Sequence, residues 1–234
     1  MIVAADYDRL RPALALGRKL RGAAGFFKVG SQLYTAEGPH AVDRIAALGY
    51  QIFLDLKFHD IPNTVAGAVA AAADLRDVAM LTLHTSGGVA MMKAAREALN
   101  GRKTRPLLLG VTVLTSMDAA ALQQIGIKVT PASQVLALAK LARQAGMDGV
   151  VASAHEAQAI RRECGPKFLI VVPGVRPVSS SANDQSRVGT PSEAIRAGAD
   201  YLVIGRPITA APDPRVAALS IAAEIANPSA VASK

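Results

Sequence analysis

The chain has 234 residues, of which 51% are hydrophobic, and carries a formal net charge of +8. Its length allows one large α/β domain or two small ones, and a single cysteine, Cys164, excludes an intramolecular disulfide and fits a reducing cytoplasm. An acid, Asp6, comes too early for a signal peptide, and the longest apolar run, Val65–Ala73, is too short to cross a bilayer. We therefore expect a cytoplasmic protein with no membrane partner.

The positive charge suggests nucleic acid as a partner, but its distribution argues against one. The basic residues are scattered, mostly where helices and their ends should face solvent. Aromatic side chains do not alternate with them, as a base-stacking surface would require. Attraction of a small anionic substrate is the better interpretation.

Short apolar runs alternate with helical patterns, with a repeat of about 29 residues, the chain length divided among eight units. The runs expected to form strands are Ile2–Asp6, Phe26–Gly30, Ile52–Lys57, Met80–His84, Leu107–Leu114, Gly149–Ser153, Phe168–Gly174 and Tyr201–Gly205. The helical patterns are Leu10–Leu20, Pro39–Leu48, Thr64–Leu75, Val89–Leu99, Ser133–Ala145, His155–Glu163, Pro191–Ala197 and Arg215–Ile225.

Near-continuous apolar strands that alternate with helices indicate a parallel sheet covered by helices. Eight such units predict a protein of the α/β class, a closed (β/α)8 TIM barrel formed as a single domain by residues 1–226. An open, doubly wound sheet is the competing architecture, but no Gly-x-Gly-x-x-Gly motif follows the first strand. The small polar tail, residues 227–234, is expected to fray.

In a barrel of this kind, function lies at the C-terminal ends of the strands and in the loops after them. The polar and glycine residues that the sequence places there are Asp6, Lys28, Asp55, Lys57, His84, Thr115, Ser116, Ser153, Arg176, Gly205 and Arg206. The opposite strand ends, such as Gln51 and Tyr201, show no comparable set. The asymmetry predicts an active site at one end of the barrel.

The third expected strand carries the densest charge pattern. Side chains alternate along a strand, so Phe53, Asp55 and Lys57 share one face. Opposite charges on an apolar strand are costly to bury unless they are paired. Asp60 follows the strand, and Pro62 then suits the first turn of a helix. This pattern indicates catalytic chemistry, although a structural ion pair at the rim of the sheet would produce it too.

A long segment, residues 174–190, follows the seventh expected strand. A loop of this length is typical of a lid or binding loop, or it is simply a floppy connection. It contains Arg176 and Gln185, and Gly205-Arg206-Pro207 follows the eighth strand. Because barrels often bind phosphate after these two strands, the residues together predict a phosphate clamp with a closing lid.

The ten residues 55–64, Asp-Leu-Lys-Phe-His-Asp-Ile-Pro-Asn-Thr, resemble the signature of the orotidine 5′-phosphate decarboxylase family. The resemblance continues in order along the chain, through Ala5-Asp6, Phe27–Gly30, Val111–Met117, Pro173–Pro177, Asp184-Gln185 and Ile204–Pro207. It implies a bacterial-type, cofactor-free homodimer that decarboxylates orotidine 5′-monophosphate (OMP) to uridine 5′-monophosphate (UMP), the last step of de novo pyrimidine synthesis.

The resemblance also implies a role for each matching residue near the reacting carbon. Lys57 would protonate C6 of the pyrimidine, and Asp55 would face the carboxylate of the substrate. Lys28 would link this charge array to the ribose. Asp60 and Thr64 would enter the active site of the neighbouring subunit.

Further roles concern the rest of the nucleotide. By the same resemblance, Asp6 would accept a hydrogen bond from a ribose hydroxyl, and Thr115 would lie near the pyrimidine ring. The lid and phosphate group would be formed by Arg176, Gln185, Gly205 and Arg206.

One alternative family shares the Asp-x-Lys-x-x-Asp arrangement. Its members are magnesium-dependent sugar-phosphate enzymes, such as hexulose-phosphate synthases and keto-gulonate-phosphate decarboxylases. Ile61-Pro62-Asn63-Thr64 and the loop with Arg176 and Gln185 favour the orotidylate family. No His-x-His pair or carboxylate cluster beyond Asp55 and Asp60 is present, so we expect no metal.

Overall fold

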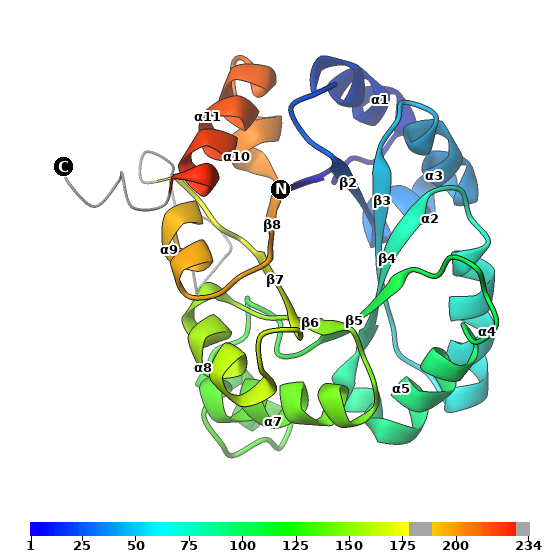
Figure 1. Cartoon of the computed structure of the whole chain (residues 1–234), viewed down its shortest axis with the longest axis vertical. Helices are drawn as coiled ribbons and strands as arrows, with labels where there is room; N and C mark the ends of the chain where they lie inside the picture. The colour runs from blue at the N-terminus through cyan, green and yellow to red at the C-terminus, as the bar shows by residue number, and fades with distance from the viewer. Residues whose placement is uncertain (178–188, 228–234) are drawn as a thin grey trace.

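The structure is a computed structural model that describes residues 1–177 and 189–227. Eight parallel strands follow one another in chain order around a closed barrel, with helices outside them (Figure 1). The first strand pairs with the last, with Ile2 opposite Val203, so the sheet has no open edge. The predicted (β/α)8 TIM barrel is confirmed. Gln185 and all of the expected tail except Asn227 lie outside the described residues.

Each expected strand is present. The strands are β1 (Ile2–Ala4), β2 (Phe26–Gly30), β3 (Gln51–Phe58), β4 (Val78–His84), β5 (Leu107–Val111), β6 (Gly149–Val151), β7 (Leu169–Pro173) and β8 (Tyr201–Ile204). The largest difference from expectation is in β5, which ends three residues early. Both the N–H and the hydroxyl of Thr112 donate to the carbonyl of Val151, and the chain then turns away from the sheet.

The eight expected helices also form. They are α1 (Leu10–Lys19), α3 (Pro39–Ala46), α4 (Pro62–Ala73), α5 (Gly88–Glu97), α7 (Pro131–Gln144), α8 (Ala154–Cys164), α9 (Pro191–Arg196) and α11 (Pro214–Ala226). The structure adds short segments in the loops after strands, namely α2 (Ser31–Glu37), the 3-10 turn η1 (Thr85–Gly87), α6 (Ala119–Gln124) and α10 (Arg206–Thr209). Several helices begin with proline, whose fixed φ and missing N–H suit a first turn.

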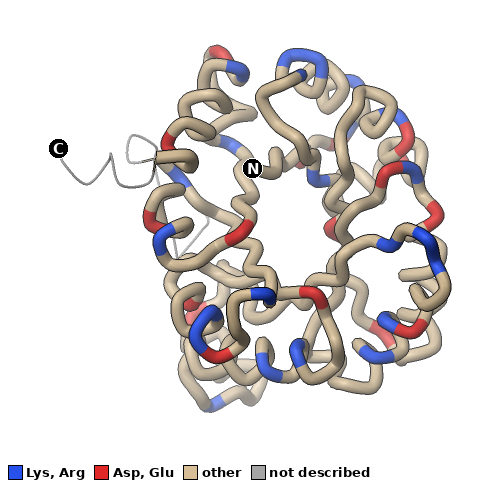
Figure 2. Tube along the Cα trace, in the orientation of Figure 1, with Lys and Arg blue, Asp and Glu red and all other residues tan. Residues whose placement is uncertain are grey.

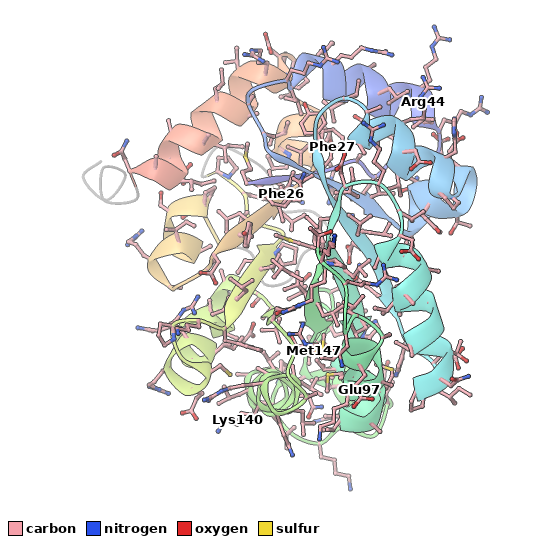
Figure 3. The ribbon with its side chains drawn as sticks, turned by 45° about the vertical axis from the view of Figure 1, so that its right-hand side comes forward. Phe26, Phe27, Arg44, Glu97, Lys140 and Met147 are labelled. Atoms are coloured by element: carbon pink, nitrogen blue, oxygen red, sulfur yellow. The ribbon has the colours of Figure 1, made fainter. Side chains whose placement is uncertain are left out.

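The apolar side chains form two layers because neighbouring residues of a strand point to opposite faces of the sheet. One layer fills the barrel interior and consists of Ile2, Ala4, Phe53, Met80, Leu109, Val171 and Val203. The other lies between the sheet and the helices. The adjacent residues Phe26 and Phe27 belong to different layers (Figure 3). Arg44, Glu97 and Lys140 extend from the outer surfaces of the helices in the same view.

The N-terminal end of the barrel is held by aspartates that precede strands. Asp148, directly before β6, accepts hydrogen bonds from Arg105 at 3.0 and 3.2 Å and from Arg96 at 3.3 Å. It also accepts the backbone N–H of Leu108 in β5 at 2.8 Å. One carboxylate therefore joins two arginines to two neighbouring strands.

Asp200 repeats this arrangement before β8. Its carboxylate accepts the N–H of Ile170 in β7 at 2.7 Å and the guanidinium of Arg161 at 2.6 Å. We call Asp148 and Asp200 the basal aspartates. The expectation that this end of the barrel carries no comparable polar set is wrong, because the basal aspartates lie one position before the apolar runs that form β6 and β8.

The basic residues are spread over helices all round the barrel, with acidic residues among them (Figure 2). This distribution matches the scatter seen in the sequence. Within residues 1–177 and 189–227, every helix is too short or too polar to span a lipid bilayer.

Candidate active site

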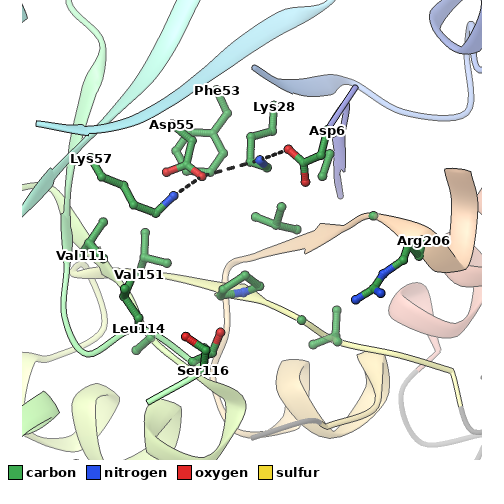
Figure 4. A pocket seen from close by; sticks show the side chains of 18 of the residues that line it. Asp6, Lys28, Phe53, Asp55, Lys57, Val111, Leu114, Ser116, Val151 and Arg206 are labelled. Carbon is green, nitrogen blue, oxygen red and sulfur yellow. Dashed lines mark hydrogen bonds and ion pairs between the residues drawn. The ribbon is translucent and has the colours of Figure 1, made fainter. Parts of the chain in front are cut away.

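A cavity of about 660 Å³ opens at the C-terminal ends of the strands (Figure 4). Every strand except β4 contributes to its lining. The apolar lining nearest the barrel interior includes Ala4, Phe53, Val111, Val151 and Val203. The polar and charged lining consists of Asp6, Lys28, Gln32, Asp55, Lys57, Thr115, Ser116, Arg176, Arg206 and Thr209.

Four charged residues from β3, β2 and the end of β1 form a chain of ion pairs, which we call the charge array. The ammonium of Lys57 lies 2.8 Å from Oδ2 of Asp55, and the same oxygen lies 3.7 Å from the ammonium of Lys28. Lys28 in turn donates to Oδ1 of Asp6 at 2.6 Å (Figure 4). Two cations therefore alternate with two anions, and the array is neutral as a unit.

Lys57 lies in a bulge of β3. Leu54 pairs with Leu81 and Phe58 pairs with Leu83, so residues 55–57 lie opposite the single residue Thr82 of β4. Inside the bulge, Lys57 has a φ of 53°, in the left-handed region that a side chain other than glycine rarely occupies. Such strain is typical of functional sites, where the surrounding structure holds the residue in place.

The surroundings of Asp55 keep its carboxyl group ionised. Burial opposes ionisation, but the charges of Lys28 and Lys57 outweigh it, assisted by hydrogen bonds from Lys57 and Thr82. Together these interactions hold the pKa of Asp55 below its usual range. Asp55 is therefore a carboxylate at neutral pH, and it forms ion pairs with both lysines beside it.

Two arginines occupy the side of the cavity formed by the ends of β7 and β8. Arg176 is buried, whereas Arg206 is exposed at the start of α10. Burial and the nearby positive charge of Arg206 lower the pKa of Arg176. The backbone N–H of Arg176 donates to the carbonyl of Gly189 at 3.0 Å. We call Arg176 and Arg206 the arginine pair. Two guanidinium groups that line one cavity favour a bound anion.

The structure brings most of the expected site residues together. Asp6, Lys28, Asp55, Lys57, Thr115, Arg176, Gly205 and Arg206 all line the one cavity. Asp60 and Thr64 are not part of this lining. Asp60 is exposed and accepts the N–H of its neighbour Ile61 at 2.6 Å, and Thr64 is exposed in the first turn of α4. A single chain does not bring these two residues to its own Lys57.

Sequence reasoning missed three polar residues of this region, and one of them, Thr209, lines the cavity from α10, a helix of four residues. Gln32 lines the cavity from α2, a helix of seven residues that the apolar pattern did not indicate. Thr82 lies in the apolar run of β4, where one hydroxyl gives no charge signal. The signal that could have revealed Thr82 is a hydroxyl on the strand next to β3, which carries Asp55. Across the described ranges, no group of three or more His, Cys, Asp or Glu is placed to hold a metal.

Comparison with known proteins gives consistent matches along nearly the whole chain. The model of the orotidine 5′-phosphate decarboxylase / HUMPS family matches residues 1–221. A curated protein of Nitrosococcus oceani is 56% identical over 227 residues, covering 97% of each chain, and bears the name orotidine 5′-phosphate decarboxylase. A protein of the same name from Chromohalobacter salexigens is 52% identical over 229 residues, covering 98% of this chain and 97% of that one.

Solved structures show the same likeness. The crystal structure of orotidine 5′-phosphate decarboxylase from Lactobacillus acidophilus has a TM-score of 0.81 at 37% identity, with 96% of this chain and 98% of that chain covered. An uncharacterized conserved protein from Geobacillus kaustophilus has a TM-score of 0.83 at 37% identity, with coverages of 96% and 99%.

Proposed function

This chain belongs to the orotidine 5′-phosphate decarboxylase / HUMPS family, and we propose that it is the carbon–carbon lyase that converts OMP to UMP and carbon dioxide. One observation carries the proposal: a charge array at β1–β3 and an arginine pair after β7 and β8 line the same cavity. A nucleotide with a reacting ring at one end and a phosphate at the other matches that division of charge. We assign the activity to residues 1–226 and to the cytoplasm.

Loss of carbon dioxide from C6 creates an unusual demand for charge stabilisation. The electrons of the broken carbon–carbon bond remain on C6, in the plane of the ring, where no π-system accepts them. An ammonium beside C6 stabilises this charge and supplies the proton that replaces carbon dioxide. Lys57 fills both roles, and water returns a proton to its amine after the reaction.

Asp55 and Lys28 prepare this ammonium. Asp55 lies 2.8 Å from the ammonium of Lys57 and holds it in place as its counter-ion. In the complex, Asp55 would also face the substrate carboxylate, and their repulsion would be relieved as carbon dioxide leaves. Lys28 binds both Asp55 and Asp6, so it connects the reacting end of the site to the ribose. The half-exposed Asp6 would accept a hydrogen bond from a ribose hydroxyl.

The remaining lining residues bind the parts of OMP that do not react. We assign the pyrimidine edge to Thr115, which lines the cavity after β5. The arginine pair and Gly205, together with Gln185 of the proposed lid, would bind the phosphate. Since the phosphate is distant from C6, its binding energy would serve to order the site around the ring.

We further propose that the enzyme is a homodimer whose sites are shared. Asp60 and Thr64 are exposed beside Ile61, a large apolar residue with 67% of its surface exposed. Burying that surface against a second copy would carry Asp60 and Thr64 to the partner's charge array.

Subunit mixing tests the shared site. When Lys57→Ala and Asp60→Ala chains exchange subunits, the hybrid dimer has one intact site, so up to about a quarter of wild-type activity should return. Mixing Lys57→Ala with Asp55→Ala is the control and should restore none, because both residues belong to the same cavity. Verified hybrid dimers without recovered activity would show that Asp60 does not act in the neighbouring site.

The activity itself is tested by following the absorbance of OMP in excess chelator. We expect full turnover without added magnesium and no turnover by Lys57→Ala. The family also contains magnesium-dependent sugar-phosphate enzymes that share the Asp-x-Lys-x-x-Asp arrangement. Strict dependence on magnesium, or no loss of OMP absorbance, would favour that alternative and contradict the proposal.

A further inference from the structure

A buried hydroxyl connects the two central members of the charge array. Thr82, on β4, has no exposed surface. Its Oγ1 accepts the backbone N–H of Lys57 at 3.0 Å and donates to Oδ1 of Asp55 at 2.9 Å. Thr82 does not line the cavity, so it would touch neither substrate nor product.

The directions of these two hydrogen bonds are fixed by chemistry. A backbone N–H can only donate, and an ionised carboxylate can only accept. The single hydroxyl proton of Thr82 must therefore point at Asp55, while its lone pair receives the N–H of Lys57. Neither bond can reverse, so the orientation of the hydroxyl is unique.

This arrangement has two effects on the array. Because Thr82 occupies Oδ1 of Asp55, the carboxylate presents Oδ2 to both Lys57 and Lys28. Because Thr82 also holds the N–H of Lys57, it supports the bulge in which Lys57 has its φ of 53°. One side chain thus sets the position of the proposed proton donor and the orientation of its counter-ion.

We infer that Thr82 is a positioning residue for decarboxylation, acting through Asp55 and Lys57 to hold the charge array in its reactive geometry. The inference rests on the proposed function and deepens it. Displacement of a reacting group by about 1 Å can cost on the order of 100-fold in rate, so a hydroxyl that controls both residues has a large effect without touching the substrate.

The electrostatics of Asp55 support the same conclusion. The ionisable groups around it are Lys28 on β2, Lys57 on β3 and His84 at the end of β4. Burial lowers the pKa of His84, with further contributions from His59 and Lys57. Thr82 adds a hydrogen bond that lowers the pKa of Asp55, so its loss should raise that pKa.

Three substitutions separate positioning from packing. Thr82→Val keeps the shape and removes the hydroxyl, Thr82→Ser keeps the hydroxyl and removes the methyl group, and Thr82→Cys keeps the size with a weak donor. We expect Thr82→Val to lower kcat by on the order of 10-fold to 100-fold with little change in KM. Thr82→Ser should stay close to wild type, and Thr82→Cys should resemble valine.

The pH profile supplies a readout that packing alone would not change. Asp55 must be ionised, and loss of the hydrogen bond raises its pKa, so the acid limb of kcat should move to higher pH in Thr82→Val and Thr82→Cys. A wild-type kcat and profile in Thr82→Val, or equal losses in serine and valine variants, would overturn the inference. If Thr82→Val does not fold, the comparison of serine with cysteine decides by the same criteria.

Wild-type turnover of OMP, measured in parallel, separates the two proposals. An inactive wild-type protein would refute the proposed function. Carbon-13 NMR of the Asp55 carboxyl group then tests the Thr82 hydrogen bond without activity. A higher Asp55 pKa in Thr82→Cys than in Thr82→Ser supports it, and equal values would refute it.

Discussion

Both ends of the barrel pair aspartates with basic side chains, but they combine them differently. At the N-terminal end, the basal aspartates bind arginines together with backbone N–H groups of neighbouring strands. At the C-terminal end, Asp55 binds two lysines and a threonine hydroxyl, and no strand N–H of the described chain is assigned to it.

The difference separates stability from chemistry. Arginine is a rigid, permanently charged fork, so Arg–Asp pairs that also hold strand N–H groups keep neighbouring strands in register. Lysine is a compact charge that can transfer a proton and whose pKa responds to its neighbours. The same kind of ion pair therefore supports the fold at one end and would support a reaction at the other. Substitutions at the two ends should produce opposite patterns of loss.

The largest effect is expected from Lys57→Ala. It removes the proposed proton donor, the cation that would face C6, and we expect kcat to fall by at least about 10,000-fold while UMP still binds. Lys93→Ala, on the exposed side of α5, is the matched control and should retain wild-type kcat. A folded Lys57→Ala enzyme with near-normal kcat would show that the charges at the C-terminal end of the barrel do not carry the reaction.

Next in size is Arg206→Ala, at the start of α10 in the lining of the same cavity. Loss of a charge-assisted contact should lower kcat/KM for OMP by on the order of 100-fold. The kcat/KM for the bare nucleoside orotidine should change little. Arg44→Ala, an exposed arginine of α3, controls for net charge. Equal losses for OMP and orotidine would show that Arg206 does not bind the phosphate.

A smaller loss of activity is expected from Gly30→Ala. A Cβ at this position would lie 2.7 Å from the ammonium of Lys28 and 3.2 Å from Oδ1 of Asp6. Because the end of a lysine side chain moves easily, the fold should survive while the array is displaced, and kcat/KM should fall about 10-fold. Gly25→Ala, whose Cβ would meet no atom within 4 Å, should leave kcat/KM unchanged.

Asp148→Asn should have the smallest effect on activity and the clearest effect on stability. It weakens bonds to two arginines and to the N–H of Leu108, and the free energy of unfolding should fall by about 2 kcal/mol. Thermal denaturation would show a lower midpoint, with kcat within about twofold of wild type. Asp74→Asn, an exposed partner of Arg102, should change neither quantity. An inactive but stable Asp148→Asn protein would contradict the division between the two ends.

The sequence was sufficient for the barrel because its strands are continuous apolar runs and its long helices have a clear period. It also placed Asp55 and Lys57 on one face, since strand alternation brings both to the cavity. Pairing of β1 with β2 then explains the contact between Asp6 and Lys28, because Ala4 lies opposite Lys28 and Asp6 follows the end of β1.

The parts that could not be predicted share physical causes. The short helices α2, α6 and α10 span seven, six and four residues, too few for a helical period to be visible. The basal aspartates lie in loops. Charged residues are common in loops, so these two do not stand out in the sequence as a charge within an apolar strand does. Asp60 and Thr64 are exposed in one chain, so their proposed contribution depends on a second chain.

The positive φ of Lys57 has a consequence for any effort to make this protein more heat-resistant. Left-handed backbone disfavours lysine by about 1 kcal/mol or more relative to glycine, which adopts it freely. Lys57→Gly would relax the backbone, but it would also delete the proposed acid and the ion pair that holds the buried carboxylate of Asp55. A search for heat-resistant variants should therefore measure turnover as well as thermal stability.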